Sequence, residues 1–118
     1  TQDTLQQALI ATGFPYSKVE QGADYAWVMQ TMDKMLPHVR DIRRLGSAAL
    51  DLCYVARGTM DGYYEINLKP WDAAAGLIIA QEAGALVTSV DGSPVHFENT
   101  TVIAANPSLH QQIVQQLQ

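Results

Sequence analysis

The chain has 118 residues, of which 47% are hydrophobic and 16% charged, and its formal net charge is −5. This length and apolar fraction suit one globular domain and exclude a disordered chain, which would be poor in apolar residues. The acidic balance argues against a general nucleic-acid binder, and no apolar run is long enough to span a membrane. The single cysteine excludes an internal disulfide, so we expect a reducing compartment, the cytoplasm.

Hydrophobic spacing predicts strands that alternate with helices. The first elements expected are a strand at 9–11, a helix at 16–36 ended by Pro37, and a strand at 42–45. A helix follows between Ser47, which suits an N-cap, and Gly58. The remaining expected elements are a strand at 63–66, a helix at 70–84, strands at 86–90 and 102–105, and a helix from Pro107. The pattern predicts an α/β fold with helices on the faces of a sheet, which is mixed because the last two strands have a short connection.

The start of the third helix is the most unusual segment, because Trp71 and Asp72 precede the small residues Ala73-Ala74-Ala75-Gly76. Small side chains let another backbone or a ligand approach closely. Asp72 either complements the positive end of the helix dipole or acts as a hard oxygen ligand for Mg²⁺. Residue type alone favours the dipole interpretation. One carboxylate cannot form a magnesium site, so a site here needs partners from elsewhere.

Two other segments could contact a substrate. Glu65 lies near the end of its strand, where residue type alone favours a solvated side chain over an acceptor for the hydroxyl groups of a polyol. Gly46, Ser47 and Ala48 place free N–H groups at a helix start, where a substrate oxygen could bind. Most helix starts bind nothing, so this signal is weak by itself.

The remaining reactive side chains have simpler interpretations. Three histidines lack metal-ligand spacing and are expected at the surface: His38, His96 and His110. Cys53 lies in an apolar helix and is expected to pack in the core. Three arginines are expected to form a solvated or interfacial face rather than a phosphate site: Arg40, Arg43 and Arg44.

Several segments resemble, in the same order, those of the inositol monophosphatase family. They are Arg44-Leu45-Gly46-Ser47-Ala48-Ala49-Leu50-Asp51, Asp61-Gly62-Tyr63-Tyr64-Glu65, Trp71-Asp72-Ala73-Ala74-Ala75-Gly76, Glu82-Ala83-Gly84 and Ala104-Ala105-Asn106-Pro107. The resemblance covers nearly the whole chain and is strongest to bacterial members. Two departures are small: Ser47 stands where animal members often have Thr, and Gly84-Ala85 replaces a Gly-Gly pair.

The resemblance implies an enzyme of layered α/β fold that hydrolyses phosphate monoesters with Mg²⁺, inositol 1-phosphate being the best-known substrate. Asp72 corresponds to the family's C-terminal metal-ligand aspartate. Glu65 corresponds to the glutamate that hydrogen-bonds the inositol ring, and the segment Gly46, Ser47 and Ala48 corresponds to one that contacts substrate hydroxyls. The intact enzyme is expected to be a homodimer that binds an inositol or sugar phosphate.

The family's upstream glutamate and its Asp-Pro-x-Asp-Gly-Thr motif do not occur in this sequence. We therefore expect residues 1–118 to be a single C-terminal domain that lacks the N-terminal metal-binding half and is inactive alone. One alternative is a phosphatase of another substrate, such as a sugar phosphate, a nucleotide-derived phosphate or histidinol phosphate. Another is a non-catalytic module whose arginine cluster contacts protein or RNA, since some bacterial relatives associate with the transcription machinery.

Overall fold

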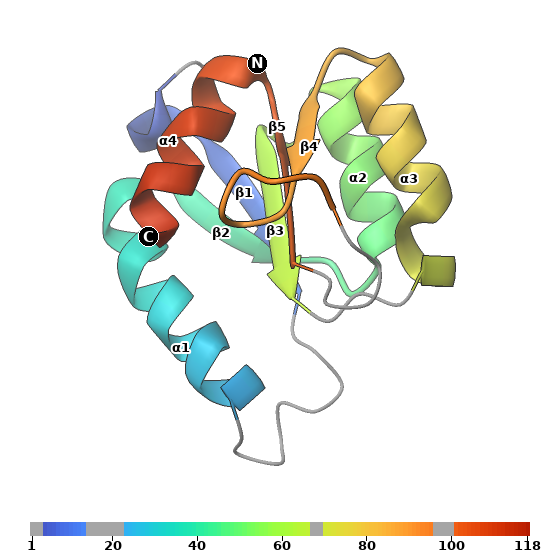
Figure 1. Ribbon diagram of the computed structural model, residues 1–118. Helices are drawn as coiled ribbons and strands as arrows, with labels where there is room; N and C mark the ends of the chain where they lie inside the picture. Colours follow the sequence, from blue (N-terminus) through green and yellow to red (C-terminus); the bar gives the residue numbers. More distant parts are fainter. Residues whose placement is uncertain (1–3, 14–22, 67–69, 96–100) are drawn as a thin grey trace.

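The computed structural model describes residues 4–13, 23–66, 70–95 and 101–118, with backbone alone for 23–24 and 70–73. Five strands form one sheet in the order β2-β1-β3-β5-β4 (Figure 1). The strands are β1 (Leu9–Thr12), β2 (Asp41–Arg44), β3 (Gly62–Ile66), β4 (Leu86–Thr88) and β5 (Thr101–Ala105). Strand β1 is parallel to β2 and β3, whereas β5 is antiparallel to β3 and β4. The predicted mixed sheet is confirmed.

Helices cover both faces of this sheet, so the fold has three layers (Figure 1). Helices α2 (Ala48–Arg57) and α3 (Pro70–Glu82) pack together on one face. Helices α1 (Ala23–Met35) and α4 (Pro107–Leu117) lie on the other, with the short 3-10 turn η1 (Leu5–Gln7) against α4. The predicted α/β fold is therefore confirmed.

Local sequence signals set the helix ends. Ser47 is the N-cap of α2, as predicted, and its Oγ accepts a hydrogen bond from the Leu50 N–H at 3.3 Å. Gly58 ends α2 in the left-handed region, with φ of 87°. Asn106 caps α4 in the same way as Ser47, because its Oδ1 accepts from the Leu109 N–H at 2.8 Å.

Several element boundaries differ from the prediction; for example, α3 ends at Glu82 rather than at residue 84. Of the first expected helix, residues 16–22 lie outside the described residues; its end at Met35 is followed by the 3-10 turn η3 (Leu36–His38), which contains Pro37. Leu45 belongs to neither the strand nor the helix but to the connection between them. Strand β4 ends at Thr88, because the Ser89 N–H turns to the Ser93 carbonyl at 2.7 Å.

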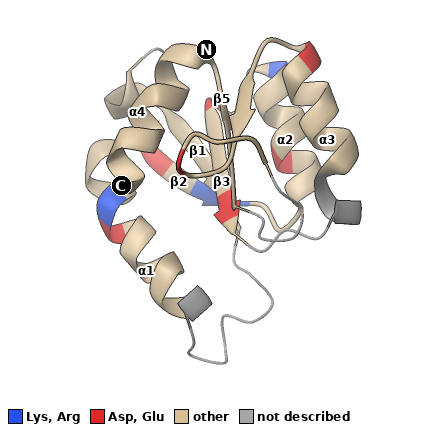
Figure 2. Ribbon diagram, in the orientation of Figure 1, with Lys and Arg blue, Asp and Glu red and all other residues tan. Residues whose placement is uncertain are grey.

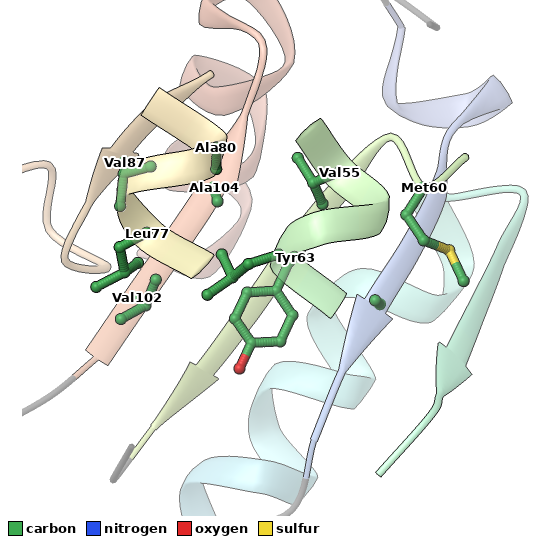
Figure 3. Close-up of a cluster of buried hydrophobic side chains, with 10 residues drawn as sticks. Val55, Met60, Tyr63, Leu77, Ala80, Val87, Val102 and Ala104 are labelled. Atoms are coloured by element: carbon green, nitrogen blue, oxygen red, sulfur yellow. The ribbon is translucent and has the colours of Figure 1, made fainter. Parts of the chain in front are cut away.

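The alternation of side chains along β3 divides the core in two. Tyr63 is fully buried on the face covered by α2 and α3, where Figure 3 shows it among aliphatic side chains such as Val55, Leu77 and Val102. Tyr64 is buried on the opposite face, with Ile103 of β5 and residues of α4. The sheet is thus buried on both sides, as expected for a three-layer fold.

The small residues of α3 allow close helix packing. A Cβ atom added at Gly76 would lie 2.9 Å from the Cβ of Leu52 on α2 and 3.4 Å from the Ala49 carbonyl oxygen. Glycine is therefore required for the two helices to approach this closely. This contact holds α2 and α3 together over the same face of the sheet.

Candidate active site

Three of the predicted site segments meet at one edge of the sheet. Strands β1, β2 and β3 are parallel, so their carboxyl ends share this edge. Helix α2 begins directly after β2, and α3 begins shortly after β3. The edge therefore collects the segment Gly46-Ser47-Ala48, Glu65 and the backbone of Asp72. Crevices at the carboxyl ends of parallel strands are where ligands bind in α/β proteins.

Glu65 is buried at this edge rather than solvated. It is only 9% exposed, and one of its carboxylate oxygens, Oε1, accepts a hydrogen bond from the Tyr63 hydroxyl at 2.7 Å. Directly after the neighbouring strand β1, a Cβ atom at Gly13 would collide with the same oxygen, so only glycine leaves room for this carboxylate. The interpretation of Glu65 as a solvated strand end, which residue type alone favoured, is wrong because Tyr63 and Gly13 enclose it.

The connection from β2 into α2 presents backbone groups to the same edge. Gly46 has φ of +88°, a left-handed conformation that favours glycine. Ser47 then caps the helix through its side chain, and its carbonyl accepts from the Asp51 N–H at 2.9 Å. The N–H groups of the first helical turn carry the positive end of the helix dipole and favour an anionic or oxygen-rich ligand.

Asp51 is a site residue that the sequence analysis missed. It lies in the first turn of α2 and is only 1% exposed, and its Oδ1 has no hydrogen-bond partner among the described residues. Burial, and next the nearby carboxylate of Glu65, raise its pKa to about 7, whereas Arg44 opposes this shift. One feature of the sequence could have identified Asp51: it is a carboxylate on the apolar side of a predicted helix, four residues before the buried Val55.

The arginine cluster lies on the edge strand β2 and before it. All three arginines are exposed, as predicted: Arg40, Arg43 and Arg44. Arg43 forms an ion pair with Asp41 at 2.9 Å, and because both side chains are well exposed this pair contributes little to stability. Arg44 is close enough to Asp51 to affect its pKa, so it borders the candidate site.

The described side chains include no group of three or more His, Cys, Asp or Glu that could hold a metal ion. Asp72 lies in the first turn of α3 at the site edge, but its side chain is outside the described part of the chain. A carboxylate at that position suits Mg²⁺ as one of several oxygen ligands. The described part of the chain therefore does not form a metal site by itself.

The other reactive side chains lie away from this edge or do not form a site. His110 of α4 is buried, 4% exposed, with its Nε2 2.7 Å from the Thr88 Oγ1, so its expected surface position is wrong. His38 is exposed as predicted, and His96 lies outside the described residues. Cys53 is a free thiol and half-buried, less enclosed than the predicted core position. No helix in the described ranges is long and apolar enough to cross a membrane.

Comparison with known proteins matches this arrangement to one family. The sequence profile described as the inositol monophosphatase family matches residues 1–118. An inositol-1-monophosphatase of Mycobacterium leprae is 56% identical over 85 residues, which cover 72% of this chain and 28% of the relative. A Nus factor SuhB of Vibrio cholerae is 44% identical over 103 residues, 87% of this chain and 38% of the relative.

Solved structures show the same fold. The extragenic suppressor protein suhB from Bartonella henselae superposes with a TM-score of 0.90 and 35% identity, covering 100% of this chain and 44% of that one. The inositol monophosphatase from Anabaena gives a TM-score of 0.87 and 35% identity, covering 98% of this chain and 45% of that one. The chain thus spans less than half the length of these relatives. With a family profile that matches from end to end, the chain belongs to the inositol monophosphatase family.

Proposed function

We propose that the chain forms the substrate-binding edge of a Mg²⁺-dependent phosphate-monoester hydrolase whose substrate is inositol 1-phosphate or a similar polyol phosphate. The observation that carries this proposal is the buried Glu65, held by the Tyr63 hydroxyl at the sheet edge where α2 and α3 begin. A fixed carboxylate is a good acceptor for hydroxyl groups. The name of the Mycobacterium leprae relative, an inositol-1-monophosphatase, supports the same substrate.

Each segment has a distinct role in this proposal. The Glu65 carboxylate accepts hydrogen bonds from substrate hydroxyls and so orients the ring. The segment Gly46-Ser47-Ala48 contributes hydrogen bonds to substrate oxygens at the positive end of α2. Asp72 is one carboxylate ligand of Mg²⁺, which when bound activates water and stabilises the leaving oxygen. The burial of Glu65 reduces competition from water for its polar contacts.

We also propose that the chain acts as the C-terminal domain of a longer, dimeric enzyme. Mg²⁺ keeps strict octahedral geometry, and hydrolysis needs more carboxylates than Asp72 alone. Relatives more than twice as long as the matched segment are consistent with further ligands outside it. We expect residues 1–118 alone to release no phosphate, and the full-length protein that carries them to release it. Mg²⁺-dependent turnover by residues 1–118 alone would show that no further ligands are needed and would contradict the proposal.

The role of Glu65 is tested by comparing two substrates in the full-length protein. Glu65→Gln removes a charged acceptor, which is expected to lower kcat/KM for inositol 1-phosphate by roughly 10- to 100-fold. Phenyl phosphate has no ring hydroxyls and is expected to be hydrolysed almost unchanged. The exposed Glu82, at the far end of α3, provides the matched control Glu82→Gln. An equal loss on both substrates would show that Glu65 does not recognise the polyol.

A second function, binding of a protein or RNA partner, is favoured by one feature. Exposed arginines lie along and before the edge strand β2, and several relatives are named Nus factor SuhB. Arg40 precedes β2 and Arg43 pairs with Asp41, so replacement of both by serine is expected to leave Arg44, Asp51 and Glu65 in place. Loss of partner binding with unchanged phosphate release would favour this second function, and the opposite result would favour the phosphatase alone.

A further inference from the structure

Two carboxyl groups are buried together at the carboxyl edge of the sheet. Glu65 comes from β3 and Asp51 from α2, and Figure 2 shows acidic positions on the lower part of α2 and at the tip of β3. Burial raises the pKa of Asp51 most and the Glu65 carboxylate next, which agrees with the position of both groups at the same edge of the sheet (Figure 2). Two negative charges in such a site repel each other strongly, so the pair is most stable with one proton between them.

The hydrogen bonds show which member keeps the charge. Glu65 accepts a 2.7 Å hydrogen bond from the Tyr63 hydroxyl, and a donor of this kind stabilises the charged form of a carboxyl group. Asp51 is more deeply buried, and its Oδ1 lacks a partner in the described part of the chain. An ionised carboxylate with an unpartnered oxygen in such surroundings is much less stable than a neutral carboxyl. These surroundings favour the proton on Asp51 over Glu65.

The charged groups around Asp51 in the described part of the chain do not reverse this assignment. Arg44, at the end of β2, favours the charged form of Asp51, but its effect is smaller than those of burial and Glu65. Strand β1 contributes no titratable side chain at this edge, where it ends in Thr12 and is followed by Gly13. From α3, the described side chains 74–82 include one titratable residue, Glu82, which is exposed at the far end of the helix.

We propose that Asp51 is a positioning residue: as a neutral, buried carboxyl beside Glu65, it leaves the negative charge of the pair on Glu65, which then accepts hydrogen bonds from the hydroxyls of the substrate. This inference rests on the proposed function for the identity of the ligand. The division of charge between Asp51 and Glu65 does not depend on the proposed function. When Asp51 ionises at higher pH, the added charge disturbs the Glu65 carboxylate and weakens binding of the polyol.

The charge division is tested directly by carbon-13 NMR titration of the two side-chain carboxyl groups in the full-length protein. The expected result is that Glu65 ionises at lower pH than Asp51, which ionises near neutral pH. In Asp51→Asn, the titration near neutral pH is expected to disappear, which assigns it to Asp51, and the titration of Glu65 is expected to remain. The reverse order, or two groups that both titrate as ordinary carboxyls, would overturn the proposal whether or not the protein is a phosphatase.

The effect on binding is tested by the pH dependence of KM for inositol 1-phosphate. From pH 6 to 8.5, KM for inositol 1-phosphate is expected to rise by roughly three- to tenfold. This range corresponds to an interaction between Asp51 and Glu65 worth up to about one pKa unit. The kcat with phenyl phosphate is expected to show no such change. Asn is neutral at every pH, so Asp51→Asn is expected to keep the low KM throughout. Glu82→Gln, the control, is expected to retain the wild-type rise.

Three results would overturn the positioning role. They are a KM that rises in Asp51→Asn as it does in the wild type, a large rise in KM at pH 6 in that variant, and the same pH effect with phenyl phosphate. If the wild-type protein hydrolyses neither ester, the proposed function fails, and the NMR titration alone decides the charge division. Asp51→Leu, which cannot form the polar contacts of Asn, shows whether a neutral side chain is sufficient.

Discussion

The two faces of the sheet treat their buried polar groups differently. On the face covered by α1 and α4, the buried polar side chains are hydrogen-bonded: the Thr31 hydroxyl donates to the Trp27 carbonyl, the Thr12 hydroxyl to the Tyr64 carbonyl, and His110 pairs with Thr88. On the face covered by α2 and α3, the Oδ1 of the buried Asp51 has no hydrogen-bond partner among the described residues, and a second carboxyl group, Glu65, lies at the same edge of the sheet. A buried polar atom without a partner costs about 1–3 kcal/mol of stability.

This difference distinguishes the two halves of one small core. Among the described residues, the α1/α4 face satisfies its buried polar side chains internally. The α2/α3 face keeps unfavourable carboxyl groups at the edge where two helices begin, and such groups concentrate where a ligand binds. The following changes compare the two faces, in order of decreasing effect.

The largest expected effect is on the packing of the two cores. Leu52 on α2 and Leu109 on α4 are both fully buried, so Leu52→Ala and Leu109→Ala should each lower the free energy of unfolding by about 2–5 kcal/mol. Leu50→Ala, at a half-exposed position, is the control and should change it by less than about 0.5 kcal/mol. Only Leu52→Ala should also impair catalysis by the folded protein, because Leu52 neighbours Asp51. If Leu109→Ala impaired catalysis equally, the two faces of the sheet would not differ in their effect on the candidate site.

The two buried titratable groups are expected to give opposite pH dependences of stability. The pKa of Asp51 is raised, so the folded state binds the extra proton and stability is lost as pH rises from about 4 to 7, by up to about 4 kcal/mol. Burial lowers the pKa of His110, so stability is lost as pH falls below 6.5, where the unfolded chain takes up a proton first.

Urea unfolding of the wild type, Asp51→Asn and His110→Gln from pH 4 to 8.5 separates these two contributions. Asp51→Asn should remove the fall in stability between about pH 4 and 7, and His110→Gln the fall in stability below pH 6.5. If Asp51→Asn left the fall between pH 4 and 7 unchanged, another group would be responsible for it.

The smallest expected effect compares the two helix caps. Ser47 caps α2 at the site, and Asn106 caps α4 through the equivalent side-chain contact to the Leu109 N–H. Ser47→Ala and Asn106→Ala should each reduce stability by about 1 kcal/mol. Kinetics of the two variants should differ, with kcat/KM for inositol 1-phosphate reduced only by Ser47→Ala. A matched loss of activity in both would assign Ser47 a purely structural role.

Most of the fold follows from local patterns in the sequence. The predicted strands and the last three helices are present, because their apolar spacing and their Ser47, Gly58 and Pro107 boundaries act over a few residues. The strand order β2-β1-β3-β5-β4 could not be predicted, since it depends on pairing between segments far apart in the chain. Strand β1, for example, pairs with β3 about fifty residues later.

The site was predictable in its segments but not in its environment. Motifs identified Gly46, Ser47, Ala48, Glu65 and Asp72 as candidates. The burial of Glu65 depends on Gly13, which follows another strand, and that of His110 on Thr88, 22 residues away, so neither could be inferred from neighbouring residues. Asp51 was missed because its significance appears only when α2 is placed beside the end of β3.

Phosphate release from inositol 1-phosphate by the full-length protein tests the central claim, that the edge where α2 and α3 begin is the active site. Asp72→Asn alters the start of α3, and Glu82→Gln alters an exposed carboxylate at the end of the same helix. We predict that kcat/KM falls by roughly 100-fold or more in Asp72→Asn and is unchanged in Glu82→Gln. Wild-type activity in Asp72→Asn would contradict the account.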